Sequence, residues 1–381
     1  MSPPAPQRVV VVGTGLVGTS LGLALRRQGV TVNLTDTDPD ALRDAVTRGA
    51  GQAGPADRVA DLCVVCVPPE ATARTLRTCQ SAGLARAYTD TASVKGSPLQ
   101  EARRLGVDLS TVVGGHPMAG AERSGPDAAR GDLFSGRPWV LTPTSETRPA
   151  ALDVVTAMLG LVGAVPVLAT PGDHDAAVAT VSHAPQVVAS LLAGLLDGAD
   201  PLALGMAGQG LRDTVRVAAS PPDLWRDILT RNAGAVGESL DRLLADLTAL
   251  RAALDTLSAR PENGAGADPH SDPVPDPGRE AATATLDEVL ARGRRGHARL
   301  PGKHGGHAAY GVVSVVVDDA PGRLAGLFAD VGESGVNVED VAIDHAPGQP
   351  QGLVQLAVAP DAAGDLSARL LAKGWSARPG P

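Results

Sequence analysis

The chain has 381 residues, 43% of them hydrophobic, which is enough for two or three domains with cores of their own. Its net charge of −9 argues against nucleic acid or an anionic membrane as the main partner, because both attract basic surfaces. We find no run of about 18 apolar residues and no N-terminal targeting pattern, so we expect a soluble, cytoplasmic protein.

The segment 8–38 carries the first motif. An apolar strand, 9–12, runs into a glycine-rich turn and a helix, and a second strand, 31–35, ends at Asp36. We expect five residues to hold the pyrophosphate of a dinucleotide at the start of this helix: Gly13, Gly15, Leu16, Val17 and Gly18. Asp36 is placed to bind a ribose 2′-hydroxyl and to repel a 2′-phosphate, which favours NAD over NADP. The alternative is a glycine turn without a ligand.

Strand and helix signals alternate as far as residue 170, as in a doubly wound parallel sheet of the Rossmann type. The expected strands are 9–12, 31–35, 62–67, 87–90, 111–115, 139–141 and 165–168. The carboxyl ends of such strands face the cofactor, so Val67 and Pro68 are placed either to contact it or to form a plain turn. Cys63 and Cys66 point to opposite faces of one strand, which indicates core residues and not a redox or metal pair.

Two strand ends bring chemically active side chains to one edge of this sheet. GGHPMAG follows the strand-like TVV and presents His116. TASVK follows AYTD and presents Ser93 and Lys95. We therefore expect a base, a hydroxyl and a cation beside one nicotinamide, the alternative for His116 being a bond to its own loop.

From Pro171 to about Ser258 the pattern changes to long apolar helices, which predicts an all-helical second domain. Three polar residues flank Pro185, where a helix loses a hydrogen bond, and we expect them to line the site: Ser182, His183 and Gln186. Arg212 and Arg216 are spaced to share a helix face, although one of them can pair with Asp213 instead.

The same region ends in an apolar stripe that must be buried. Its members are Leu240, Leu243, Leu244, Leu247, Leu250, Leu254 and Leu257. We expect a homodimer interface here, and a core within the chain is the alternative. Trp225 is a candidate for the wall of the substrate pocket, with plain packing as an equal alternative.

Residues 259–309 are rich in Pro, Gly, Asp and Arg and predict a flexible linker with a short helix around 285–291. Its histidines, His297, His304 and His307, lack a framework of cysteine or carboxylate ligands, so no metal site is expected. Residues 310–381 predict a compact βαββαβ unit. Here PGRLAGLF followed by GVNVEDV resembles an ACT domain, a module that often binds amino acids in related enzymes; a structural or dimerising module is the alternative.

Six motifs in order, GTGLVGTS, TASVK, GGHPMAG, SHAPQ, LRDTVRVA and LW, together with the ACT-like tail, resemble the prephenate/arogenate dehydrogenase family of tyrosine biosynthesis. The implied architecture is a Rossmann domain (1–170), a helical substrate and dimerisation domain (171–258), the linker (259–309) and an ACT-like domain (310–381). The implied reaction is NAD-dependent oxidative decarboxylation of a cyclohexadienol, with a small-molecule substrate and an amino-acid effector as partners.

By this resemblance His116 accepts the proton of the ring hydroxyl, Ser93 orients it and Arg216 binds a substrate carboxylate, with Lys95 adding positive charge. The rate should then rise with pH through an apparent pKa of about 6.5. Many family members that use prephenate have a second histidine where this chain has Gln186, so the choice between prephenate and arogenate stays open, with prephenate slightly favoured. An NAD-responsive regulatory protein without catalysis is the competing class.

Overall fold

The computed structural model describes residues 5–120, 125–259, 276–300, 310–345 and 350–380. The chain forms two compact units. The first comprises Met1–Asp197 and Val215–Arg242, and the second comprises Gly198–Thr214 and Leu243–Pro381.

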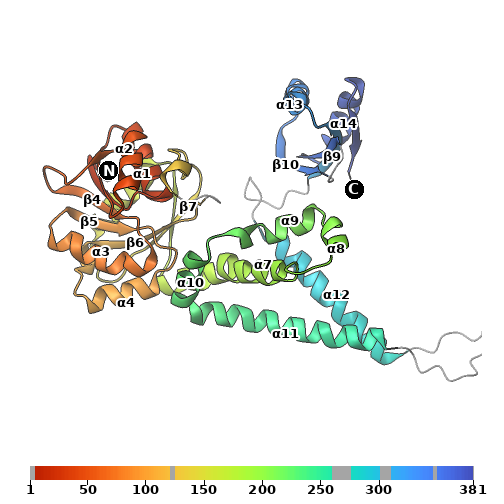
Figure 1. The fold of residues 1–381 in the computed structure, drawn as a ribbon, viewed down its shortest axis with the longest axis horizontal. Helices are drawn as coiled ribbons and strands as arrows, with labels where there is room; N and C mark the ends of the chain where they lie inside the picture. The colour runs from red at the N-terminus through yellow and green to blue at the C-terminus, as the bar shows by residue number, and fades with distance from the viewer. Residues whose placement is uncertain (1–4, 121–124, 260–275, 301–309, 346–349, 381) are drawn as a thin grey trace, which may run out of the picture. The chain divides into compact units, whose positions relative to one another are not determined.

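A sheet in the order β3-β2-β1-β4-β5-β6-β7-β8 organises the first unit (Figure 1). Its strands are β1 (Arg8–Val12), β2 (Thr31–Thr35), β3 (Gln52–Ala53), β4 (Ala60–Val65), β5 (Ala85–Asp90), β6 (Val112–Pro117), β7 (Pro138–Thr142) and β8 (Val165–Leu168). The strands from β3 to β6 are parallel, which confirms the Rossmann-type core. The expectation of a wholly parallel sheet is wrong, because β7 runs antiparallel to β6 and β8 pairs in parallel with β7. The described part of the 118–137 connection holds no α-helix, and a parallel return needs such a crossover.

Helices cover both faces of this sheet. They are α1 (Leu16–Arg27), α2 (Pro39–Thr47), α3 (Pro69–Ser81), α4 (Gly96–Arg104) and α5 (Pro149–Leu161). Leu21 of α1 and Val155 of α5 pack in the core of one face, and Leu76 of α3 packs in the core of the other. Cys63 and Cys66 belong to different faces, which confirms their interpretation as packing residues. With both faces covered, the carboxyl ends of the strands are left to carry a site.

The helical region begins at Pro171, as predicted. Within the first unit it comprises α6 (Pro171–Val178), the π-helical turn η3 (Ala179–His183), α7 (Ala184–Gly194), the 3₁₀ turn η4 (Arg216–Ala219), α10 (Pro222–Arg231) and the start of α11 (Ala233–Ser258). The stretch Pro171–Gly194 is long and apolar enough to cross a membrane by length and composition alone. It carries His174, Asp175 and His183 in buried polar contacts with other parts of the unit, so we interpret it as a helix with one face packed inside this unit.

The second unit contains α8 (Pro201–Gly205), α9 (Gln209–Val215), most of α11 and α12 (Pro277–His297). Leu243, Leu244, Leu247 and Leu254 of the predicted stripe are exposed on α11. The helix α12 is much longer than the one predicted for the linker. Asp276 accepts hydrogen bonds from the amides of its first turn, and this cap explains why the helix begins earlier than predicted. His304 and His307 lie outside the described residues.

A four-stranded antiparallel sheet in the order β10-β11-β9-β12 follows in this unit. Its elements have the predicted βαββαβ order: β9 (Gly311–Asp318), α13 (Arg323–Glu333), β10 (Val338–His345), β11 (Gln351–Val358), α14 (Ala363–Ala372) and β12 (Ser376–Pro379). Alternating strand residues such as Val313 and Val315 pack against Leu327 of α13 and Leu366 of α14. This sheet therefore has a hydrophobic core of its own.

Candidate active site

The glycine turn after β1 has the geometry that a dinucleotide requires. Gly13 has a φ of 99°, and a Cβ there would lie 2.3 Å from the carbonyl oxygen of Cys66. A Cβ on Gly18 would lie 1.9 Å from the carbonyl oxygen of Gly13. Side chains are thus excluded where the turn meets the neighbouring strand and where the helix approaches the turn. Gly15 is the N-cap of α1, and Leu16 and Val17 begin the helix, whose N-terminus suits a pyrophosphate.

Asp36 follows β2 directly and is bound to this turn. Its Oδ2 accepts hydrogen bonds from the backbone N–H and the hydroxyl of Thr14, at 2.5 and 2.8 Å, and its Oδ1 accepts one from the N–H of Asp38. Burial alone would raise the pKa of this carboxyl, but the donors from Asp38 and Thr14 hold the pKa below its ordinary value. Asp36 is therefore ionised at neutral pH, as the repulsion of a 2′-phosphate requires.

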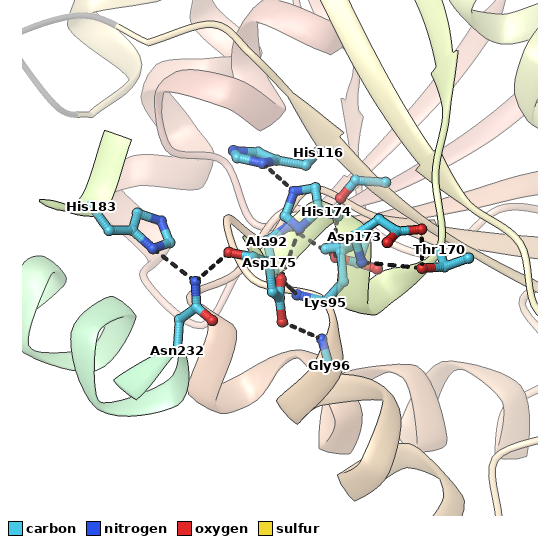
Figure 2. A network of polar contacts seen from close by, with 12 residues as sticks. Ala92, Lys95, Gly96, His116, Thr170, Asp173, His174, Asp175, His183 and Asn232 are labelled. Carbon is cyan, nitrogen blue, oxygen red and sulfur yellow. Dashed lines mark hydrogen bonds and ion pairs between the residues drawn. The ribbon is translucent and has the colours of Figure 1, made fainter. Parts of the chain in front are cut away.

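His116 lies near the end of β6 and forms the outer member of a chain of three polar side chains (Figure 2). Its Nδ1 is 2.9 Å from Nε2 of His174, and Nδ1 of His174 is 2.7 Å from Oδ1 of Asp175. The other two members come from the first turns of α6, and His174 is only 2% exposed. His116 thus has a buried partner in the helical region, and not only the loop that follows it.

His174 and Asp175 were not among the site residues predicted from the sequence. Thr170 caps α6 by accepting a hydrogen bond from the backbone N–H of Asp173, with Pro171 at the first helical position. This pattern in TPGDHD fixes where the helix begins and places a histidine and a carboxylate in its first turns. A helix start directly after a sheet strand was the signal that could have drawn attention to the pair.

Lys95 differs from the expectation that it adds charge to a substrate pocket. Its ammonium group forms an ion pair with Asp90 and donates a hydrogen bond to the carbonyl of Gly115. Its side chain is 2% exposed and that of Asp90 is 6% exposed. The charge is therefore already compensated inside the protein, and the hydrogen bond to Gly115 ties the loop after β5 to the strand that carries His116.

Ser93 lies in the same loop, partly buried, between β5 and α4. Because β5 and β6 are parallel neighbours, the structure brings Ser93 and His116 to the same edge of the sheet, as predicted. Val67 and Pro68 occupy the corresponding position after β4, and Pro68 is the N-cap of α3. The backbone N–H of Glu70, two residues on, donates to Asp227 of α10, which holds this loop against the helical region.

Pro185 explains the shape of the helix that carries His183. It lacks an N–H, and its ring crowds the carbonyl four residues earlier, so the turn before it widens into the π-helical η3. His183 ends this turn, 1% exposed, and its Nδ1 lies 3.0 Å from Nδ2 of Asn232. The same Asn232 amide donates to the carbonyl of Asp175, so one side chain links both histidine-bearing segments (Figure 2).

The other predicted substrate residues lie along these helices. Ser182 in η3 is partly buried, and Gln186 in α7 is 5% exposed, with its side-chain oxygen unpartnered within the described chain. Arg216 begins η4, which packs against α7. The Trp225 ring stands edge-on to His183 with 6.0 Å between centroids. Arg212 belongs to the second unit.

Charge and burial favour the neutral form of His116, and burial favours the neutral form of His183. Burial, and then electrostatic repulsion from Lys95, lower the pKa of His116 well below its ordinary value. Burial lowers the pKa of His183 to about 4. A neutral imidazole at position 116 can accept a proton at physiological pH, so it can act as a general base at the edge of a sheet that also carries a dinucleotide turn.

Comparisons with known proteins agree with this chemistry. A family model described as the nucleotide-binding domain of prephenate dehydrogenase matches residues 21–168, and one described as its dimerization domain matches residues 170–262. A protein from Streptomyces niveus named probable prephenate dehydrogenase NovF is 41% identical over 97% of this chain and 98% of its own length. A cyclohexadienyl dehydrogenase from Zymomonas mobilis is 32% identical over 65% of this chain and 88% of its own.

Solved structures of similar fold include prephenate dehydrogenase from Aquifex aeolicus in complex with hydroxyphenyl propionate and NAD+. That structure is 26% identical, with a TM-score of 0.63 over 76% of this chain and 98% of its own. A Synechocystis arogenate dehydrogenase is 28% identical, with a TM-score of 0.59 over 76% of this chain and 99% of its own.

Proposed function

Because the chain belongs to the prephenate dehydrogenase family, and is thus an NAD-dependent oxidoreductase, we propose that it converts prephenate to 4-hydroxyphenylpyruvate and CO₂. The observation that carries the proposal is the position of His116. A neutral imidazole with a buried partner stands at the strand edge where a Rossmann-type fold holds its nicotinamide. The glycine turn and the ionised Asp36 fit NAD, since they exclude side chains where the pyrophosphate lies and oppose a 2′-phosphate.

In the proposed reaction, the glycine turn and Asp36 would hold NAD+, which would supply the acceptor for the hydride of the carbinol carbon of the substrate ring. His116 accepts the proton of the hydroxyl on that carbon, and Ser93 orients the hydroxyl. The resulting dienone loses the ring carboxylate as CO₂, since the electrons of the broken carbon–carbon bond complete an aromatic ring. His116 then returns its proton to the phenolate oxygen, so the imidazole is regenerated.

Binding of the second substrate carboxylate is assigned to Arg216, at the start of η4 beside α7. Ser182, His183, Gln186 and Trp225 form the proposed pocket for the side chain of the substrate. Lys95 is left out of this set because its ammonium is buried against Asp90.

Arogenate is the second candidate substrate. The side-chain oxygen of Gln186 is buried and has no partner among the described residues, which favours arogenate, because an amide oxygen can accept from the ammonium group that distinguishes arogenate from prephenate. The chain is similar to both a prephenate and an arogenate dehydrogenase, so these similarities do not distinguish the two substrates. We keep prephenate as the proposed substrate on the match to the Streptomyces niveus protein over nearly the whole chain.

A steady-state assay decides between these substrates. Purified protein is given NAD+ with either prephenate or arogenate, and NADH absorbance is followed. The proposal expects turnover with prephenate and a lower kcat/KM with arogenate. The reverse order would assign the enzyme to arogenate, and turnover with neither would support the non-catalytic regulatory protein.

We also propose that the chain is a cytoplasmic homodimer and that its last 72 residues, 310–381, form an ACT domain that binds an amino-acid effector. Four exposed leucines on α11 and the dimerization domain in the family match support the dimer. The βαββαβ order supports the ACT assignment. Light scattering at micromolar concentration tests the dimer, and addition of tyrosine to the prephenate assay tests the effector.

A further inference from the structure

We propose that His174 and Asp175 are positioning residues that keep His116 in the tautomer protonated at Nδ1, so that its Nε2 is the atom that accepts the substrate proton. The inference rests on the proposed function, which needs His116 as a proton acceptor. The observation that carries it is the unbroken chain of hydrogen bonds from His116 through His174 to Asp175 (Figure 2).

The inner end of the chain is fixed by Asp175. Its Oδ1 accepts from the backbone N–H of Lys95, and its Oδ2 accepts from that of Gly96, both at 2.8 Å, where α4 begins. Burial alone would raise the pKa of Asp175, but the donors from His174, Gly96 and Lys95 hold the pKa below its ordinary value. An ionised carboxylate can only accept, so the hydrogen between it and His174 belongs to Nδ1 of His174.

The middle of the chain then determines its outer end. A neutral His174 that carries its hydrogen on Nδ1 has a bare Nε2, which can only accept. The group facing that nitrogen is Nδ1 of His116 at 2.9 Å, so this nitrogen of His116 must carry the hydrogen. The available lone pair of His116 is consequently on Nε2, the ring nitrogen that is not hydrogen-bonded to His174.

A doubly protonated His174 would reverse this assignment, because its Nε2 would donate and His116 would then carry its hydrogen on Nε2. Its position opposes this form. His174 lies in the first turns of α6, where the helix N-terminus disfavours a cation. The charge of Asp175 is already met by two backbone donors at the start of α4.

Nitrogen NMR of the free enzyme tests the tautomer without any substrate. The full chain is labelled with ¹⁵N-histidine, and long-range proton–nitrogen correlation identifies which ring nitrogen of each histidine carries hydrogen. A His116→Asn variant assigns the signals of His116. We expect hydrogen on Nδ1 and a bare Nε2. A bare Nδ1 in the wild-type protein overturns the proposal, even if the variants below fail to fold.

Two variants separate positioning from simple packing. His174→Phe keeps a ring but removes the acceptor, so we expect His116 to populate the other tautomer and kcat to fall by roughly 10²-fold with KM for prephenate nearly unchanged. His174→Gln restores an acceptor oxygen and should recover part of both kcat and the Nδ1-protonated signal. His297→Gln, at an exposed histidine of α12, is the matched control and should leave the spectrum of His116 and kcat unchanged.

If His174→Phe binds NAD+ normally and keeps both the wild-type tautomer and the wild-type kcat, the proposal is overturned. Failure of the proposed function has a different signature. In that case wild-type protein turns over neither prephenate nor arogenate, whatever tautomer the spectrum shows.

Discussion

Replacement of Lys95 by Met gives the sharpest contrast between a structural and a substrate-binding role. Lys95 and Asp90 form a buried ion pair, with side chains 2% and 6% exposed. Lys95→Met leaves the Asp90 carboxylate without its cation and the Gly115 carbonyl without its side-chain donor. Breaking such a pair from one side costs about 3–5 kcal/mol of unfolding free energy, because the remaining charge stays buried.

Urea unfolding followed by tryptophan fluorescence measures this loss, since Trp139 is fully buried in the same sheet. With an m-value of about 2 kcal/mol/M, the midpoint should fall by about 2 M. The double variant Asp90→Asn/Lys95→Met carries no uncompensated charge and should be more stable than Lys95→Met alone.

The opposite pattern would refute this reasoning. If Lys95 held a substrate carboxylate, Lys95→Met would raise KM for prephenate while the urea midpoint stayed within the error of the measurement. A double variant no more stable than Lys95→Met would likewise show that the buried charge of Asp90 is not the source of the loss.

Further predictions concern the histidines and the cofactor. His116→Asn should lower kcat by roughly 10²-fold or more while NAD+ affinity, measured by fluorescence titration, stays nearly intact; normal turnover would reject His116 as the base. Because the pKa of His116 lies well below the ordinary 6.5, kcat/KM should be level from pH 8 down to 6.5 and fall only at lower pH, and a pH profile with its midpoint at 6.5 would contradict this. His183 has a pKa of about 4 in the folded chain and 6.5 when unfolded, so the unfolded chain binds more protons between these pH values. The free energy of unfolding should therefore fall by roughly 3 kcal/mol from pH 6.5 to 4. Urea melts of His183→Asn should lack this pH-dependent loss of stability. Asp36→Ser should raise the kcat/KM ratio of NADP to NAD, and an unchanged ratio would remove Asp36 from ribose recognition.

The fold was predictable wherever a local pattern determines it. The strand, glycine turn and helix of 9–27, the helical start at Pro171 and the βαββαβ order all follow from periodicity and capping, which act over a few residues. The direction of β7 was not predictable in this way. It depends on how the long 118–137 connection returns to the sheet, and no local pattern encodes that.

The candidate site likewise contains residues that local sequence patterns could predict and residues that they could not. His116 and Ser93 were predictable because the ends of neighbouring parallel strands meet at one edge. The pairing of His116 with His174 joins residues 58 positions apart, and a one-dimensional pattern carries no record of it. The ion pair of Lys95 was not predictable either, since a cation in a motif says nothing about a buried carboxylate that neutralises it. The structure lowers the apparent pKa expected for the base below 6.5, and the sequence could not indicate this because burial depends on the assembled fold.

The bonds from Thr14 to Asp36 have a consequence for cofactor engineering. The carboxylate that would choose between NAD and NADP also anchors the turn under the pyrophosphate through two donors of one residue. Exchanging Asp36 alone releases that anchor, so a variant with a higher ratio of NADP to NAD use should also bind both dinucleotides less tightly. A productive swap must supply a new acceptor for Thr14 in the same step, which makes these two positions a single unit for protein design.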